Sequence, residues 1–391
     1  MAIIVQKYGG SSVADVQKIG IVAQQIVQRA RAGNSLVVVV SAMGKSTDAL
    51  IRQAGEVCSA PPRREMDMLV TAGERISMAL LTMAIHDLGE EAISFTGSQS
   101  GIITEDSHQG ARILEVRPYR IEEELGRGKV VIVAGYQGVS LKREVTTLGR
   151  GGSDTTAVAL AAALGAECCE IYSDVDGVYD ADPNVCPQAR LIPEIGCEAM
   201  QTMASAGAKV LNAQAVEFAR RAEIAIVARK TGDSSGRQTR VVAQGKRRPK
   251  EVTAVVGASS VSRITGAFER VQEIEQAIRR AGGCPFGLNG GPAHAEIWAH
   301  RTDIPGKAAA PLAEVAEPFK AQHWDGATVT VVGNDLLSEA LGLARERLEQ
   351  AGIAVAGMLA SESSLSFGVE SACLDQAVQT LHASFLSTPS E

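Results

Sequence analysis

Glycines and hydroxyl side chains are concentrated between residues 145 and 160. Three of the glycines, Gly149, Gly151 and Gly152, let the backbone approach a ligand where any Cβ atom would clash. Ser153 is predicted to be a helix N-cap, because an apolar, Ala-rich run follows it. A Gly-rich loop that leads into a helix N-terminus suits an anion, commonly a phosphate. An ordinary Gly-rich turn with helix capping fits the pattern about equally well, since short motifs match by chance.

Two charged side chains accompany these glycines. Arg150 carries a guanidinium fork that matches a carboxylate or a phosphate. Asp154 is an unusual neighbour for an anion, and it suggests a role in orienting a cation, either a lysine or a metal. Together the two residues indicate a site where Arg150 binds an anion and Asp154 orients a nearby cation.

A lysine stands at the end of the first predicted strand. Residues 2–6 form a short buried strand that ends at Lys7, and Gly9 and Gly10 follow before apolar residues at helical spacing from Val13. In such a strand–loop–helix unit, the loop amides can hold phosphate oxygens while Lys7 neutralises phosphoryl charge. The alternative is a surface lysine before a turn.

Strands and helices alternate through the first half of the chain. Further strands are predicted at 36–40, 92–95, 130–134, 170–173 and 224–228. This order gives a mostly parallel α/β sheet with helices on both faces, which binds ligands at the carboxyl ends of its strands. The loop after the second strand contains Gly44-Lys45-Ser46. It is not a Walker A loop, because Val39 stands where that motif requires its first glycine.

Three other polar segments have competing interpretations. Glu74, in a helix predicted at 66–86, either faces a substrate amine or pairs on a solvated surface. The acids between 174 and 182 lack the ligand set and closing Glu of a calcium-binding EF-hand, so a loop that frames a nucleotide fits better. His294 and His300 have no evident third partner, so they are expected to be ordinary histidines rather than metal ligands.

Composition restricts the class of protein. A chain of 391 residues exceeds what one core usually serves, so two or three domains are expected. The net charge of −7 argues against a nucleic-acid partner. Seven cysteines without a C-x-x-C pair fit reduced thiols in the cytoplasm. No apolar run is judged long enough to span a membrane, and no secretion signal is recognised, so a cytoplasmic protein is predicted.

The second half has a different pattern. Residues 244–251 are polar and basic, and they are predicted to link a catalytic domain, 1–243, to a regulatory region, 252–391. Residues 328–386 give the order βαββα, which resembles a small ferredoxin-like module. Residues 252–318 have the length of a divergent second copy. Gly and Pro clusters stand there where a helix is expected, and no Pro-Gly pair leading a helix is found.

Motifs across roughly the first 235 residues resemble those of aspartate kinase, in the same order. They are KYGGSSV (7–13), VVSAMGKSTDAL (39–50), TAGER (71–75), TGSQSGIIT (96–104), AGYQGV (134–139), TTLGRGGSDTTA (146–157), YSDVDGVYDADP (172–183) and GAKVLNAQAVEFA (207–219). The wider amino acid kinase superfamily shares only the looser Gly-rich pieces. The second half resembles, more weakly, the tandem ACT regulatory region of aspartate kinases. The implied fold is therefore an amino acid kinase-like α/β domain followed by α+β ACT modules.

The resemblance implies a set of site residues. Lys7 stabilises the transferring γ-phosphoryl group and Asp154 organises Lys7, so these two are the catalytic pair. Glu74 takes the amino group of aspartate and Arg150 its α-carboxylate. The implied substrate-binding residues are Ser41, Thr47, Glu74, Arg150 and Ser153. The implied ATP-binding residues are Lys7, Gly9, Gly10, Ser173, Asp174, Tyr179, Asp182 and Lys209.

The same resemblance implies the reaction and its partners. ATP phosphorylates the side-chain carboxylate of L-aspartate, with Mg²⁺ held largely by the nucleotide and no protein metal site. A homodimer or larger homo-oligomer forms through the ACT-like modules, and inhibition by lysine or threonine is expected to be weak or lost. The product enters aspartate-family amino-acid biosynthesis or a specialised pathway. Two alternatives stay open: a kinase for another acidic amino acid, and a catalytically silent amino-acid-binding subunit, against which retention of Lys7, Asp154 and Arg150 counts.

Four positions depart from the family pattern. Asn212 and Gln214 stand where His and Arg are usual, which puts nucleotide affinity or local packing in question. Ser173 replaces a usual Thr and keeps the hydroxyl, and Asp180 stands where Thr is common. None of these changes removes a catalytic group.

Overall fold

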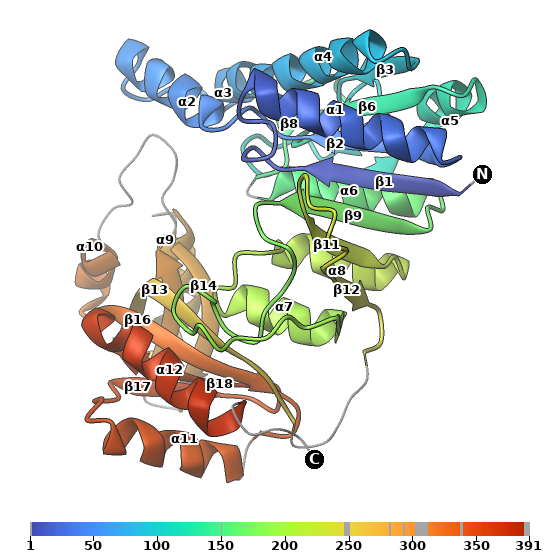
Figure 1. Cartoon of the computed structure of the whole chain (residues 1–391). Coiled ribbons are helices and arrows are strands. Elements are labelled where there is room, and N and C mark those ends of the chain that lie inside the picture. Colours follow the sequence, from blue (N-terminus) through green and yellow to red (C-terminus); the bar gives the residue numbers. More distant parts are fainter. Residues whose placement is uncertain are drawn as a thin grey trace. The chain divides into compact units, whose positions relative to one another are not determined.

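The computed structural model of the chain describes residues 2–149, 151–245, 251–280, 283–291, 294–301, 312–336 and 339–386. The chain divides into two compact units (Figure 1). The first comprises Met1–Val178, Ile192–Gln201 and Val210–Gly245, and the second comprises Tyr179–Leu191, Thr202–Lys209 and Lys246–Glu391. Two segments of the predicted catalytic domain, 1–243, thus belong to the second unit. The predicted linker at 244–251 stays a prediction, and its residues 246–250 lie outside the described residues.

The first unit is built on an eight-stranded sheet. Its strands, in spatial order, are β10 (Glu194–Gly196), β12 (Gln238–Val242), β11 (Ile226–Lys230), β9 (Cys168–Ser173), β1 (Ile3–Tyr8), β2 (Ser35–Val40), β6 (Val130–Ala134) and β3 (Ala92–Phe95). Every neighbouring pair is parallel except β11 with β12. The prediction of a mostly parallel α/β sheet is confirmed.

Helices cover both faces of this sheet. The helices in this part of the chain are α1 (Val16–Arg31), α2 (Ser46–Val57), α3 (Arg63–Val70), α4 (Ala72–Asp87), α5 (Tyr119–Gly126), α6 (Gly152–Ala163), α7 (Cys197–Ser205) and α8 (Ala213–Ala222). Helices α1 and α4 lie side by side (Figure 1) and bury the alternate strand residues Ile4, Leu36 and Val38. Because side chains alternate along a strand, Lys7 points to the opposite face, where α6 packs.

A second, smaller sheet was not predicted. Its strands are β5 (Ile113–Val116), β4 (Ile102–Thr104), β7 (Gln137–Ser140) and β8 (Val145–Thr147), in that spatial order. Strand β8 ends directly before the Gly-rich segment at Gly149. The last strand of the small sheet therefore leads into the Gly-rich segment near the carboxyl end of the large sheet.

The helix expected at 66–86 is two helices, because the chain turns at Thr71 between α3 and α4. Within the motif at 207–219, helix α8 begins only at Ala213, where the Asn212 side chain caps it by accepting from the Gln214 and Ala215 amides. Lys209 therefore lies before the helix rather than in it.

One helical stretch meets the length and composition of a membrane span, contrary to the expectation from sequence. It runs from Arg63 to Asp87, through α3 and α4. In the first unit, Leu81 and Ile85 of this stretch are fully buried in the core against α1. The apolar window of the stretch is 39% buried inside the described part of the chain, and Ile76 and Met83 are exposed.

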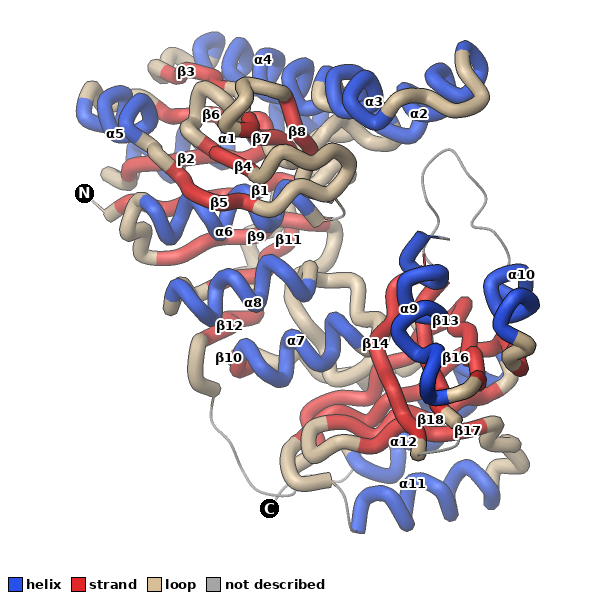
Figure 2. The backbone as a smooth tube through the Cα atoms, turned by 180° about the vertical axis from the view of Figure 1, so that it is seen from behind, coloured by secondary structure: helices blue, strands red, loops and turns tan. Residues whose placement is uncertain are grey.

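The second unit contains one six-stranded sheet (Figure 2). In spatial order the strands are β14 (Gly283–Gly290), β15 (Ala295–Arg301), β13 (Val252–Gly266), β16 (Gln322–Gly333), β18 (Ser364–Val369) and β17 (Gly357–Ala360). The helices are α9 (Val271–Arg280), α10 (Leu312–Ala316), α11 (Glu339–Gln350) and α12 (Leu374–Phe385). All strand pairs in this sheet are antiparallel.

This sheet is made of two copies of one pattern. The first copy runs β13, α9, β14, β15, α10, and the second runs β16, α11, β17, β18, α12. The expectation that glycines displace a helix in the first copy is wrong, because α9 is present and Gly283 and Gly290 bound strand β14. The sequence also carries Pro305-Gly306 ahead of α10, outside the described residues, so the statement that no Pro-Gly pair leads a helix was wrong as well.

Each copy has its own apolar core. In the first, Ile274 and Ile278 of α9 pack against Ile264 and Ile297 of the sheet. In the second, α11 and α12 bury Val329, Val331 and their neighbours on β16 and β18. The apolar spacing in α9, at positions four apart, is the feature that makes this helix despite the surrounding glycines.

Candidate active site

The strand order of the first unit defines where a ligand binds. Strand β1 lies between β2 and β9. From β1 the chain builds the sheet through β2 to β6 on one side, and from β9 through β11 on the other. Connections therefore leave β1 and β9 in opposite directions, and open α/β sheets bind ligands in the crevice at the carboxyl ends of such strands.

Lys7 and Asp154 meet beside this crevice. The Lys7 Nζ and Asp154 Oδ1 atoms lie 2.7 Å apart, and each side chain is 13% exposed. The ion pair is shielded from most solvent screening, yet it is open enough to touch a ligand. Strand β1 supplies the lysine and the first turn of α6 supplies the acid. The structure thus brings the two residues of the implied catalytic pair together.

The loops after β1 and β2 pack backbone against backbone. The Gly9 amide donates to the Tyr172 carbonyl at 3.2 Å, and the Gly44 amide donates to the Gly10 carbonyl at 3.0 Å. A Cβ atom at Gly10 would lie 2.9 Å from the Ala42 carbonyl oxygen, so only glycine fits there without a shift. These contacts place the loop glycines between the ends of β1, β2 and β9.

Two of the implied substrate residues lie on the loop and helix after β2. The Ser41 amide donates to the Tyr8 carbonyl at 3.1 Å, which holds the start of this loop beside the end of β1. Thr47 lies in the first turn of α2 and is partly exposed. Ser41 is therefore at the same end of the sheet as Gly10.

The Gly-rich segment differs from the prediction at its helix cap. Gly151, not Ser153, is the N-cap of α6, with a left-handed φ of 68° that favours glycine. A Cβ atom there would also lie 2.2 Å from the Asn212 side-chain amide. Ser153 lies inside the helix, where its Oγ would be 2.8 Å from a Cβ atom at Gly135. Arg150 lies outside the described residues.

Glu74 is buried with an unused oxygen. Its side chain follows Gly73 in the first turn of α4, and the residue is 4% exposed. Oε1 accepts the Ala42 amide at 3.3 Å, whereas Oε2 has no hydrogen-bond partner within the described ranges. Burial raises the pKa of Glu74 from 4.5 to about 7. A buried carboxylate with a free oxygen is a site for a cationic group, such as a substrate ammonium.

A polar pocket lies on the other side of β1, at the ends of β9 and β11. Its volume is about 390 Å³. The lining residues are Asp176, Lys230, Thr231, Gly232, Asp233, Ser235 and Arg237. The Thr231 amide donates to the Ser173 carbonyl at 2.9 Å, which connects this pocket to the predicted nucleotide residues Ser173 and Asp174. Lys230 was missed from the sequence, although a Lys-Thr-Gly run at a strand end is the kind of signal that marked Lys7.

Three of the implied ATP-binding residues belong to the second unit. Tyr179 and Asp182 lie in the segment 179–191, and Lys209 lies at the end of 202–209. The Asp182 carboxylate accepts the Asn184 backbone amide at 2.9 Å and the Asn184 side-chain amide at 3.0 Å. It therefore holds a local turn. Lys209 is exposed.

A buried aspartate supports the Gly-rich segment and was not predicted. Asp67 of α3 has no exposed surface. It accepts the Thr147 hydroxyl at 2.8 Å, the Thr147 amide at 3.2 Å and the His108 Nδ1 atom at 2.8 Å. Thr147 is the last residue of β8, immediately before the Gly-rich segment. Asp67 shares one helical stripe with Val70 and Glu74, and an acid on an apolar stripe could have been recognised from sequence.

Across the part of the chain that the structure describes, no group of three or more His, Cys, Asp or Glu residues is arranged to hold a metal ion.

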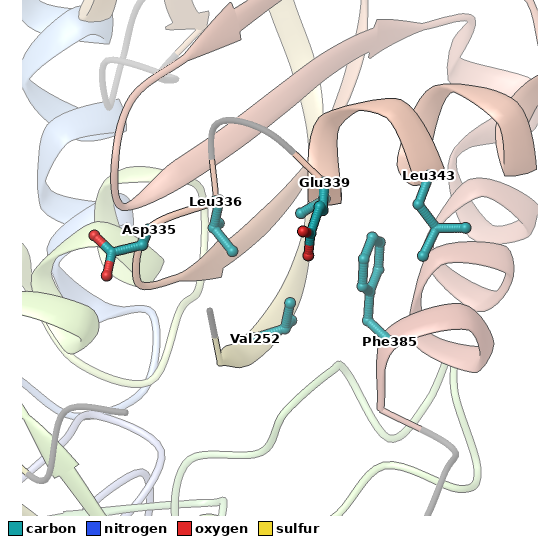
Figure 3. Close-up of a pocket in the computed structure, with 7 residues that line it drawn as sticks. Val252, Asp335, Leu336, Glu339, Leu343 and Phe385 are labelled. Carbon is teal, nitrogen blue, oxygen red and sulfur yellow. The ribbon is translucent and has the colours of Figure 1, made fainter. Parts of the chain in front are cut away.

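A second pocket, of about 190 Å³, lies in the second unit. It is lined mainly by the apolar residues Leu336, Leu343 and Phe385 (Figure 3). Asp335 and Glu339 also line it, and none of the predicted site residues does.

Comparison with known proteins gives the family. The sequence model described as the amino acid kinase family matches residues 2–229. The aspartokinase of Mycolicibacterium smegmatis is 58% identical over 227 residues, which cover 58% of this chain and 54% of the relative. The chain thus matches about half the length of that relative. The aspartokinase of Geobacillus stearothermophilus is 39% identical, over 98% of this chain and 97% of the relative.

Solved structures show the same fold. E. coli aspartokinase III in complex with aspartate and ADP superposes with a TM-score of 0.84 at 24% identity, over 99% of this chain and all of that one. The aspartate kinase of Synechocystis is 34% identical, with a TM-score of 0.57, over 100% of this chain and 70% of that one. The first likeness shows the fold, and the second adds a sequence relationship. The chain therefore belongs to the amino acid kinase family and, within it, to the aspartokinases.

Proposed function

We propose that the protein is an aspartate kinase, which transfers the γ-phosphoryl group of ATP to the side-chain carboxylate of L-aspartate. The products are ADP and 4-phospho-L-aspartate. The observation that carries this proposal is the 2.7 Å pair of Lys7 and Asp154 at the carboxyl end of β1. A relative matched over nearly its whole length is named aspartokinase, and a structural neighbour was solved with aspartate and ADP.

The chemistry requires placement more than proton transfer. The attacking carboxylate is already ionised at neutral pH, so it needs no general base. Catalysis then rests on alignment of the two substrates and neutralisation of phosphoryl charge. Lys7 supplies the positive charge, and Asp154 holds the ammonium in place within the sheet–helix interface.

Glu74 and Arg150 give the site its preference for an α-amino acid. The free Oε2 of Glu74 accepts the substrate ammonium, and the Arg150 fork binds the α-carboxylate. Ser41, Thr47 and Ser153 add hydroxyl contacts around the carboxylate that reacts. This set leaves the side-chain carboxylate of aspartate directed toward Lys7.

The nucleotide contacts come from the other side of the crevice. The amides of Gly9 and Gly10 hold phosphate oxygens, and Ser173, Asp174, Tyr179, Asp182 and Lys209 bind the rest of ATP. To these the structure adds Lys230, in the polar pocket beside Ser173. Mg²⁺, when bound with ATP, would neutralise phosphate charge and would take its ligands mainly from the nucleotide and water.

The wider setting is also part of the proposal. The enzyme catalyses the first step of aspartate-family amino-acid biosynthesis, or of a specialised pathway derived from it. It is cytoplasmic, in keeping with the free thiols of all its cysteines, and it forms a homodimer or larger oligomer through its βαββα copies. Weak or absent inhibition by lysine or threonine remains a prediction. A disrupted helix in the first βαββα copy cannot be its cause, because α9 is present.

A coupled assay of ADP release tests the function. The purified protein is given ATP and Mg²⁺ with aspartate, glutamate or N-acetylglutamate, and hydroxylamine traps any acyl phosphate. We expect ADP and a hydroxamate with aspartate alone. A hydroxamate with glutamate instead would support the kinase for another acidic amino acid. No ADP with any acid would support the silent subunit, which the retained pair of Lys7 and Asp154 argues against.

A further inference from the structure

The segment Tyr179–Leu191, called the excursion below, is a loop whose two ends lie side by side. The Ile192 amide donates to the Val178 carbonyl at 2.8 Å, and Tyr179 and Leu191 form an isolated β-bridge. The chain therefore leaves the first unit at Val178 and returns to it at the adjacent residue Ile192. Between these points the excursion packs entirely in the second unit.

Asp180 is the polar centre of this excursion. Its Oδ1 atom accepts the Arg190 amide at 2.8 Å, and its carbonyl oxygen accepts the Val255 amide of β13 at 2.7 Å. The same Oδ1 lies 3.0 Å from the Nε2 atom of His382, on the C-terminal helix α12. Asp180 is 7% exposed and His382 is 3% exposed. Because a carboxylate only accepts, Nε2–H of His382 is the donor.

Apolar contacts pack the rest of the excursion against α12. Ala181 and Cys186 are buried in the core that contains Val378 and Leu381 of α12. The side-chain amide of Gln379, on the same helix, donates to the Val185 carbonyl at 2.8 Å. The excursion is thus attached to α12 by two polar contacts, at Asp180 and Val185, and by apolar packing.

The contact between Asp180 and His382 joins two buried groups. A hydrogen bond between a buried histidine and a buried carboxylate is strong. Removal of Asp180 leaves the His382 donor without its acceptor, whereas removal of His382 leaves Asp180 Oδ1 with the Arg190 amide.

We propose that Asp180 and His382 are positioning residues for nucleotide binding, through which α12 fixes the conformation of the excursion that carries Tyr179 and Asp182. This inference rests on the proposed function, because those two residues are nucleotide contacts only if the protein binds ATP. Binding is reciprocal across such a link: nucleotide strengthens the docking of the excursion on α12, and loosening that docking weakens nucleotide affinity.

Three variants of the full-length protein test the inference. His382→Leu keeps the volume and apolar packing but removes the donor, and His382→Gln restores a donor at nearly the same place. Gln376→Ala is the matched control, because Gln376 lies on α12 and donates to Ala351 at 3.3 Å, away from the excursion. Asp180→Asn provides a second route, since it keeps the shape and the acceptor for Arg190 while it removes the charge.

Two measurements are made on each variant. Calorimetry gives the Kd of ADP with Mg²⁺, and hydrogen exchange reports amide protection in peptides from 179 to 191. We expect His382→Leu to raise the Kd by about tenfold and to speed exchange in those peptides, as loss of one buried charged hydrogen bond implies. Asp180→Asn should act in the same direction, His382→Gln should recover most of the affinity, and Gln376→Ala should match the wild type.

The outcomes separate the inference from the function on which it rests. Unchanged exchange in both His382→Leu and Asp180→Asn would overturn the attachment. Faster exchange with an unchanged Kd would overturn its role in nucleotide binding. If the wild-type protein binds no ADP, the proposed function fails together with the nucleotide part of this inference, and exchange still decides whether His382 holds the excursion.

Discussion

The ammonium of Lys7 and the carboxylate of Asp154 lie 2.7 Å apart, one on the central strand β1 and the other in the first turn of α6. They are 147 residues apart in sequence. Their contact depends on parallel packing of β1 between β2 and β9, which turns Lys7 toward the helix. The sheet topology therefore assembles the charge pair, and the loops around it add the substrate contacts.

Glu74 makes the stability of the free protein depend on pH. Burial raises its pKa from 4.5 to about 7, so the folded state binds more protons than the unfolded chain between those values. Stability contributed by this group is full below pH 4.5 and is lost as pH rises toward 7. Glu74→Gln removes the effect. As the pH rises from 5 to 8, the free energy of unfolding measured with urea should fall by on the order of 2 kcal/mol more in the wild type than in the variant. Parallel profiles for the two proteins would contradict the raised pKa.

The same carboxyl controls the affinity for aspartate. Only ionised Glu74 attracts the substrate ammonium, and a pKa of about 7 leaves it mostly protonated at pH 6. The KM for aspartate should therefore rise by about tenfold from pH 8 to pH 6, while the KM for ATP does not follow. Steady-state kinetics in the two buffers measures this. In Glu74→Gln the pH dependence should disappear; if it persists, another group is responsible.

Much of the fold was predictable because its strongest signals are local. Strands 92–95 and 130–134 match the structure residue for residue, and the predicted order βαββα is present over 328–386. The two strands are apolar runs between polar loops. The strands of the small sheet were missed because three or four residues carry too little periodicity. Helix α9 was missed because the glycines around it were weighed above Ile274 and Ile278.

The site was predictable where motif and topology coincide. Lys7, Gly9 and Gly10 follow from a strand, a Gly-rich loop and a helix in sequence. Asp67 and His382 could not be assigned a role in this way, because their partners lie 80 and 202 residues away along the chain. The interleaving of 179–191 with the second unit has the same origin: it is a long-range packing relationship with no local sequence signal.

Asp67 should control both stability and substrate affinity. In Asp67→Asn one of the two accepting oxygens becomes an NH₂ donor, which faces either the Thr147 amide, beside Oδ2, or the Thr147 hydroxyl, beside Oδ1. Burial of mismatched donors should lower the free energy of unfolding by about 2–3 kcal/mol. Because Thr147 leads into the Gly-rich segment, the KM for aspartate should also rise. Thermal unfolding and kinetics measure the two effects, with exposed Asp106→Asn as a control of matched chemistry. A stable variant with unchanged kinetics would remove Asp67 from the site.

Arg150→Lys should damage the use of aspartate rather than that of ATP. Lysine keeps the positive charge but loses the bidentate fork that matches a carboxylate. The KM for aspartate is expected to rise by about tenfold or more, while the KM for ATP stays close to the wild-type value. Paired substrate titrations decide the point. If the KM for ATP rises and that for aspartate does not, Arg150 serves the nucleotide.

The most direct measurement of the central claim is hydroxamate formation from aspartate and ATP by Lys7→Ala. Removal of a preorganised charge at a phosphoryl site raises the barrier by about 3 kcal/mol, which is at least a hundredfold in kcat. Lys142→Ala, which breaks an exposed ion pair with Asp106, is the control. The account predicts that Lys7→Ala loses nearly all hydroxamate formation with an unchanged unfolding temperature, and that Lys142→Ala keeps it. A near-wild-type kcat in folded Lys7→Ala would contradict the account.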